Sequence, residues 1–136
     1  MQYKNSIPMI QYKIVGLADP ISSGEVKYQY YPRICARQKI NLRQVSKDIS
    51  NQSSFTSSDV YGVLRSFIEN LPNYLLQNYS VELDDFGIFS LHAKAKGSPS
   101  EKQAKADKIK ELKIAFRPNK ILKDQLSSAQ FKKIKP

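Results

Sequence analysis

The fold is decided by residues 80–123, which read SVELDDFGIFSLHAKAKGSPSEKQAKADKIKELKIAFRPNKILK. Residues 80–93 predict a β-hairpin, because apolar residues alternate before two aspartates that suit a turn, and an apolar return strand follows. Residues 94–107 are rich in lysine and small residues and have no apolar period, which predicts a mobile arm or loop, with a short helix over 99–106 as the alternative. Residues 108–116 return to strand. The stretch therefore predicts two strands joined by a basic arm.

Two helices are predicted ahead of this stretch. Asn41 is a favourable N-cap residue, and the apolar positions that follow it at helical spacing predict a short helix over 42–51. Thr56 begins a sequence that resembles a capping box, and an apolar stripe over 60–75 predicts a longer helix, whose last turn Pro72 should kink or weaken. The stripe is wide for so small a protein, so we expect a partner chain to help cover it.

The flanks of the chain add strands and one more helix. Alternating residues over 10–17 and 26–34 predict two strands, the second at a sheet edge because of Pro32, and we expect both to flank the hairpin sheet. Asn119 should cap a final amphipathic helix whose apolar face extends to Phe131.

The predicted fold class is α+β. Residues 1–36 form a β extension packed on a main domain of residues 37–136, and within that domain the arm covers residues 93–112. A length of 136 residues is that of one compact domain with an added terminal segment.

Charge points to a polyanionic partner. The chain carries a net charge of +10, of which residues 93–136 contribute +9, whereas residues 56–92 carry −4. DNA, RNA and anionic membrane are the natural partners of such a field. A solvated lysine-rich surface without a partner is the alternative reading of the same composition.

The sequence gives little indication of a catalytic site or a metal site. Cys35 is the one cysteine, which excludes an internal disulfide and fits a reducing compartment. His92 is the one histidine, and with a single cysteine it cannot supply a clustered metal site. Five glycines leave no glycine-rich phosphate loop, and no apolar run has the length of a signal peptide or a membrane span. We expect a cytoplasmic protein that is not an enzyme and has no cofactor, small-molecule substrate or membrane partner.

The candidate binding residues form a basic cluster within thirty residues. Phosphate contacts from such side chains supply affinity without sequence information, and lysines on a mobile arm can follow a duplex backbone. The candidates for DNA contact are Lys94, Lys96, Lys102, Lys105, Lys108, Lys110, Lys113, Arg117, Lys120 and Lys123.

Two motifs in order resemble the HU/IHF family of bacterial histone-like proteins. The family shows a Gly-Phe-Gly-x-Phe hairpin signature, which DFGIF (85–89) matches with Asp85 in place of the first glycine. It closes with Phe-x-Pro-Gly-Lys-x-Leu-Lys, which FRPNKILK (116–123) matches with Asn119 in place of glycine. The Tyr-Tyr-Pro-Arg sequence at 30–33 is similar to HU-related proteins of Bacteroidetes-type bacteria that carry an N-terminal extension.

The resemblance implies an intertwined homodimer whose two arms reach around double-stranded DNA in the minor groove, bending or compacting it in the nucleoid. Arg117, Lys120 and Lys123 match basic phosphate contacts near the last helix, and Lys94 and Lys96 match the basic root of the arm. The family's arm tip usually reads Arg-Asn-Pro-x-Thr-Gly, with a proline that wedges between base pairs. This chain lacks that motif, so Pro99 is the only candidate wedge in the arm.

Two other functions remain open at this point. The tyrosines of the N-terminal extension suit a protein interface, so an HU-like scaffold could act as a structural adaptor. RNA is the third candidate partner, since counterion release does not separate polyanions.

Overall fold

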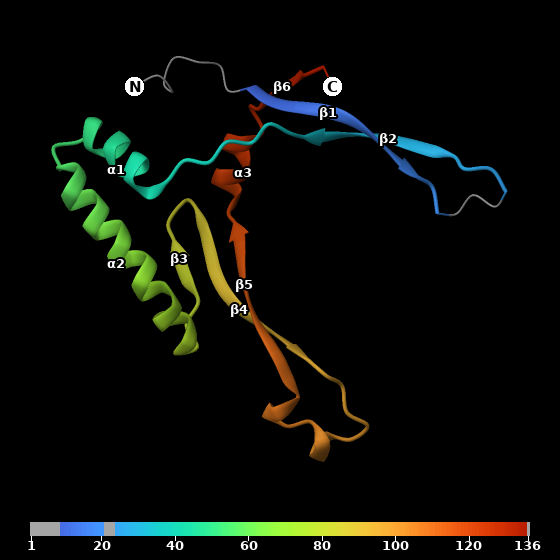
Figure 1. Cartoon of the computed structure of the whole chain (residues 1–136). Coiled ribbons are helices and arrows are strands. Elements are labelled where there is room, and N and C mark those ends of the chain that lie inside the picture. The colour runs from blue at the N-terminus through green and yellow to red at the C-terminus, as the bar shows by residue number, and fades with distance from the viewer. Residues whose placement is uncertain (1–8, 21–23, 136) are drawn as a thin grey trace.

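The structure, a computed structural model, describes residues 9–20 and 24–135. Within them it is an α+β protein with three α-helices and two three-stranded sheets (Figure 1). In chain order the elements are β1 (Met9–Ala18), β2 (Tyr28–Ile34), α1 (Leu42–Asn51), α2 (Ser57–Leu76), β3 (Val81–Leu83), β4 (Gly87–Ala95), β5 (Ile109–Pro118), α3 (Lys120–Leu126) and β6 (Gln130–Lys133).

Both of the first two helices begin where their capping residues predict. The Asn41 side chain accepts a hydrogen bond from the Gln44 amide at 2.9 Å, and the Thr56 hydroxyl accepts one from the Asp59 amide at 3.1 Å. Each cap satisfies an amide that has no partner inside the helix. Helix α1 has the predicted bounds, and α2 continues past Pro72 to Leu76, although proline cannot donate a backbone hydrogen bond.

The hairpin β3–β4 turns at a residue with left-handed backbone. Asp85 has φ of +60°, a conformation that glycine adopts without strain and that aspartate tolerates better than most residues. Gly87 then starts β4 opposite Pro118 of β5. The Phe116 ring of β5 lies 5.0 Å from the Phe86 ring and 4.8 Å from the Phe89 ring, so an aromatic cluster ties the turn to β5.

The N-terminal strands form a separate sheet together with β6, which corrects the expectation that they flank the hairpin sheet. Its order is β2-β1-β6, with β1 antiparallel to β2 and parallel to β6, while the second sheet has the order β3-β4-β5. Strand β2 lies at an edge, as Pro32 predicts. The pairing of β1 with β6 joins the N-terminal extension to the C-terminal end of the main domain, whereas the boundary between residues 36 and 37 stays a prediction.

The last helix is shorter than predicted. Helix α3 ends at Leu126, and Phe131 lies in β6 rather than on the helix. The chain turns at Ser127, and the Ile134 amide then donates to the Tyr12 carbonyl at 2.9 Å. Backbone groups that a longer helix would have paired internally are paired with β1 instead. The spacing of the apolar residue at 131 fits either structure.

The apolar core of a single chain is incomplete. Among the described residues, Val60 (8% exposed) and Leu75 (4%) are the buried apolar side chains. The accessible surface is 12059 Å². A compact monomer of 15.5 kDa exposes about 7,200 Å². Extended hairpins and exposed helix faces contribute to the difference, so many large apolar side chains have little cover from the described part of their own chain.

Candidate nucleic-acid interface

Strands β4 and β5 form a two-stranded ribbon with two chemically different faces. Paired residues of antiparallel strands share a face, and successive residues alternate between faces. His92 pairs with Lys113, and Ile88 pairs with Arg117. Lys94, two residues beyond His92, lies on the same side. We call this side, with His92, Lys94, Lys113 and Arg117, the basic face.

The opposite side of the ribbon is apolar. It carries the pairs Phe89 with Phe116, Leu91 with Ile114 and Ala93 with Leu112. Apart from Ile88, which pairs with Arg117, and Ala115, the register therefore keeps the apolar residues of the ribbon off the basic face, so that this face can meet a polyanion while the apolar face does not.

The basic face also holds one acidic residue, Glu111, opposite Lys94. Directly beyond this pair the register shifts, because Ala95 pairs with Ile109 and Lys110 has no partner across the ribbon. Such an irregularity increases the local twist of a ribbon. It therefore changes the direction of the arm at the point where the arm leaves the sheet.

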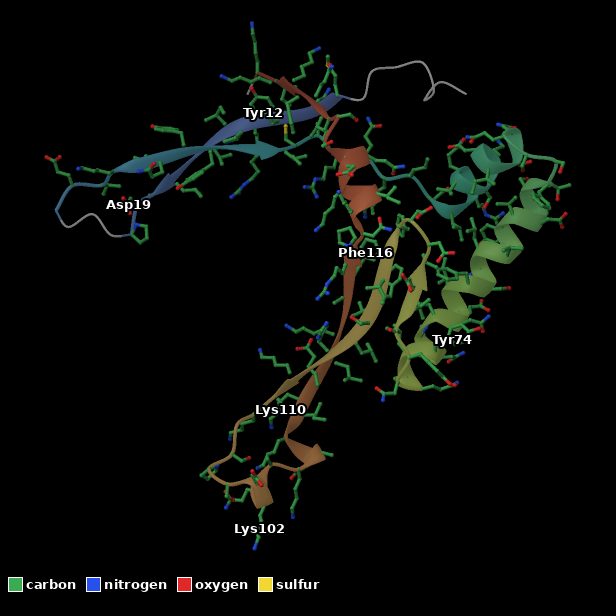
Figure 2. The ribbon with its side chains drawn as sticks, turned by 180° about the vertical axis from the view of Figure 1, so that it is seen from behind. Tyr12, Asp19, Tyr74, Lys102, Lys110 and Phe116 are labelled. Atoms are coloured by element: carbon green, nitrogen blue, oxygen red, sulfur yellow. The ribbon has the colours of Figure 1, made fainter. Side chains whose placement is uncertain are left out.

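The tip of the arm is closed by a backbone hydrogen bond. The Lys96 amide donates to the Lys108 carbonyl at 2.9 Å. Beyond that bond lie two single 3₁₀ turns, η1 (Glu101–Gln103) and η2 (Ala106–Lys108), in place of the helix over 99–106 considered above. Figure 2 shows Lys102 at the far end of the arm and Lys110 nearer the sheet.

The ten basic residues of the predicted cluster follow this ribbon from one end to the other. Three lie on the basic face (Lys94, Lys113 and Arg117), four on the tip (Lys96, Lys102, Lys105 and Lys108), one at the register shift (Lys110) and two on α3 (Lys120 and Lys123). All are exposed except Lys108, which is half-buried. Within residues 9–20 and 24–135 none of them takes part in an ion pair, although Glu111 lies opposite Lys94 across the ribbon.

Pro99 lies on an exposed bend directly before η1, beyond the last paired residues of the arm. The structure thus places it in the tip segment together with the tip lysines.

His92 belongs to the basic face and was not among the predicted contacts. It is exposed, lies opposite Lys113 and its Nε2 is 3.4 Å from the Ser90 hydroxyl. Only the strand register places it there, since a single histidine in the sequence gives no sign of which face it occupies.

Helix α3 follows β5 at the base of the ribbon. The Asn119 side chain accepts a hydrogen bond from the Leu122 amide at 3.0 Å and so caps α3 at the position where the resembling family has glycine. This cap fixes the direction in which α3 leaves the ribbon, and with it the positions of Lys120 and Lys123.

A metal site and a membrane-spanning helix each have structural requirements, which the described part of the chain does not meet. It contains no group of three or more His, Cys, Asp or Glu side chains placed to hold a metal ion. None of the helices found there combines the length and the apolar character that crossing a membrane requires.

Solved structures share this fold. A crystal structure from Bacteroides vulgatus ATCC 8482, described provisionally as a bacterial DNA-binding protein, superposes with a TM-score of 0.60 at 8% sequence identity. The match covers 93% of this chain and 49% of that chain, so this chain spans about half the length of the Bacteroides vulgatus protein. The Anabaena HU–DNA cocrystal structure superposes with a TM-score of 0.51 at 18% identity, covering 65% of this chain and 98% of that chain.

Sequence comparison places the chain in a family. No curated protein matches it. The profile of the family described as "HU domain fused to wHTH, Ig, or Glycine-rich motif" matches residues 9–133, which includes both sheets and all three helices described above. The chain therefore belongs to this family of HU domains.

Proposed function

We propose that the chain is an architectural protein that binds double-stranded DNA with little sequence preference, as a homodimer, and bends or compacts it in the bacterial nucleoid. The observation that carries the proposal is the row of ten basic side chains, eight on the β4–β5 ribbon and its tip and two on α3 at its base, free of ion pairs with described residues. Membership of a family of HU domains and the shared fold of the Anabaena HU–DNA structure support it.

The composition of the row favours sequence tolerance. Nine of its ten members are lysines, and Arg117 is the only arginine. Whereas the planar guanidinium of arginine favours bidentate contacts of fixed geometry, a lysine ammonium acts on phosphate as a point charge. Contacts of this kind position a protein on the duplex without selecting a sequence.

The incomplete core supports the proposal of a homodimer. Val63 on α2 is 70% exposed and Leu76 at its end is 69% exposed, which leaves apolar helix surface open to water. A second chain of the same sequence would cover it, and an isologous dimer would present two arms to one duplex.

Several finer features complete the proposal. Pro99 is the candidate wedge for bending, because it is exposed on the arm tip beside the tip lysines. We further propose that residues 1–36 are an extension packed on a DNA-binding domain of residues 37–136, as in the Bacteroidetes-type subgroup, and the strands β1 and β2 support this proposal. The role is one of binding and not of catalysis.

The proposal is tested by salt titration of binding to a labelled duplex of about 30 base pairs. The logarithm of affinity should fall linearly with the logarithm of salt concentration and should not change when the sequence is scrambled. Replacing Lys94, Lys113 and Arg117 together with glutamine should reduce the slope by about 2.7 per protomer, or about 5 for a dimer.

The matched control replaces Lys13, Lys27 and Arg33 of the N-terminal strands and their loop with glutamine, which removes the same charge away from the ribbon. The slope should then stay unchanged. Absence of binding at low salt would refute the proposal, and an equal loss of slope in both triple variants would refute the ribbon as the interface. Competition with duplex RNA in the same assay decides between the two polyanions.

A further inference from the structure

One face of the sheet β2-β1-β6 carries no charged side chain on β1 or β2. The register pairs Tyr12 with Ile34, Ile14 with Pro32, Gly16 with Tyr30 and Ala18 with Tyr28, and paired residues share a face. Lys13 and Arg33 pair with each other and so lie together on the opposite face. We call the side that holds Tyr12, Ile14, Tyr28, Tyr30, Pro32 and Ile34 the uncharged face.

Most of the uncharged face is open to solvent, although Tyr12 at its β6 end is half-buried. Tyr30 is 70% exposed, Tyr28 57% and Ile14 44%. A Cβ atom built on Gly16 would lie 3.0 Å from Cε1 of Tyr30, so the tyrosine ring lies against the backbone of β1 and presents its other side outward. Near β6 the face is hollowed by a cavity of about 470 Å³, lined by Tyr12, Ile14, Pro32, Ile34 and Phe131.

Among the elements formed by residues 9–20 and 24–135, none is seen to cover this face along the β1–β2 hairpin. Pairing of β1 with β6 ends at Tyr12, so the rest of the strand pairs with β2 alone. Figures 1 and 2 show the β1–β2 hairpin extending to the side of the β4–β5 ribbon opposite to α1 and α2. An apolar surface that projects away from its own core is typical of a contact with another chain.

We propose that the β1–β2 hairpin packs its uncharged face on a second copy of this chain, so that the N-terminal extension is part of the dimer interface and not of the DNA interface. The inference rests on the homodimer of the proposed function and names a surface that the dimer uses. It adds a contact made by the extension to the contact expected between the helical cores.

Charge and area both favour a second copy as the occupant. Each chain carries +10, so two copies repel unless they meet where no like charges are buried. From Ile14 to Ala18 on β1 and from Tyr28 to Pro32 on β2 the uncharged face meets this condition, because Lys133, which pairs with Tyr12 and shares the face, lies at its β6 end. A nucleic acid would need cations beside the exposed rings of Tyr28 and Tyr30, whereas Lys13 and Arg33 lie on the other face. The surface that the chain exposes beyond a compact monomer is several times the roughly 800 Å² per partner of a standard interface, so the dimer can include both the helices and the hairpin.

The first test uses two substitutions that differ only in the face they alter. Ile14 and Leu17 both lie on β1, and each is 44% exposed. Leu17 pairs with Gln29 on the face opposite to Ile14. Sedimentation equilibrium should show that Ile14→Lys raises the dimer dissociation constant by about tenfold or more, because it places a charge in a desolvated contact. Leu17→Lys should change it by less than about twofold.

The second test does not depend on the stability of a charged variant. Benzoylphenylalanine is placed at Tyr30, or at Gln29 as the control, and nitrogen-15-labelled chain is mixed with unlabelled chain before irradiation. Tyr30 and Gln29 are neighbours on β2 that face opposite sides of the sheet. Cross-links between labelled and unlabelled chains are expected from position 30 and not from position 29.

Three results would overturn the inference. The two lysine variants could weaken the dimer equally, or position 30 could give no interchain cross-link. Alternatively, Tyr30→Ala could reduce DNA affinity while the dimer constant stays the same, which would assign the face to nucleic acid. Duplex binding measured on the same proteins separates the two proposals, because a dimer that fails to bind DNA refutes the proposed function and leaves this inference standing.

Discussion

Replacing Gly87 with alanine tests the junction between the hairpin turn and β5. A Cβ atom at this position would lie 2.5 Å from the Arg117 carbonyl oxygen and 2.5 Å from Cε2 of Phe116. The carbonyl belongs to the strand backbone, and the Phe116 ring is packed between Phe86 and Phe89, so neither neighbour can move without disturbing the sheet. The added methyl group must therefore displace β4 from β5.

The expected cost follows from two opposing effects. Overpacking of this kind costs about 1–3 kcal/mol. Alanine restricts the unfolded chain more than glycine does, which offsets about 0.4–1 kcal/mol. We therefore expect Gly87→Ala to lower the free energy of unfolding by about 1.3 kcal/mol.

Urea denaturation followed by circular dichroism at 222 nm, at matched protein concentration, measures this free energy. Gly97 is the control, because a Cβ atom there meets nothing within 4 Å and the residue lies in the arm. Gly97→Ala should change the free energy by less than about 0.5 kcal/mol. If Gly87→Ala unfolds at the same urea concentration as the unaltered protein, the close approach of β4 and β5 at this point is wrong.

Four other changes have defined outcomes. Gly62→Ala should stabilise α2 by about 0.5–1 kcal/mol in the same assay, because the added methyl group meets nothing within 4 Å and alanine favours the helix; a loss of stability would mean that this position is packed. Asn119→Ala should cost about 1 kcal/mol through loss of the α3 cap, and Asn119→Gly only a few tenths, with equal costs arguing against the cap. Asp85→Val should destabilise by more than about 1 kcal/mol and Asp85→Gly should not, since φ there is +60°; thermal denaturation distinguishes them. The thermal midpoint should rise with protein concentration, as mass action requires of a dimer, and a constant midpoint would indicate a folded monomer.

The helices could be predicted closely from local sequence. Asn41 and Thr56 supply the side-chain oxygen that a helix start requires, and the apolar spacing that follows each fixes the helical period. The secondary structure at Phe131 could not be predicted in this way. Its spacing from the apolar residues of α3 fits a longer helix, but the backbone there pairs with β1, and no local signal reports a partner so distant in sequence. The same long-range pairing explains why the N-terminal strands form a separate sheet.

The basic cluster could be identified from composition, but its division between faces could not. Whether Lys94 and Lys113 share a side depends on which residues of β4 and β5 pair, and the shift that leaves Lys110 without a partner changes the alternation along β5. His92 reaches the basic face through the same register. The uncharged face of the extension likewise depends on the pairing of Ile14 with Pro32, because alternation within a single strand does not show which residues of two strands share a side.

The parallel pairing of β1 with β6 also sets the order in which the protein can fold. Met9 pairs with Gln130, so this ladder joins segments that are almost as far apart in sequence as the chain allows. Contacts of such high sequence separation form slowly, because the entropy of closing the intervening loop is lost before they can stabilise anything. At a synthesis rate of 5–20 residues per second, β1 leaves the ribosome on the order of ten seconds before its partner strand. Throughout that interval β1 has only β2 to pair with, and because an isolated two-stranded hairpin is marginally stable in water, the sheet of the extension is expected to be completed only after the main domain has been synthesised.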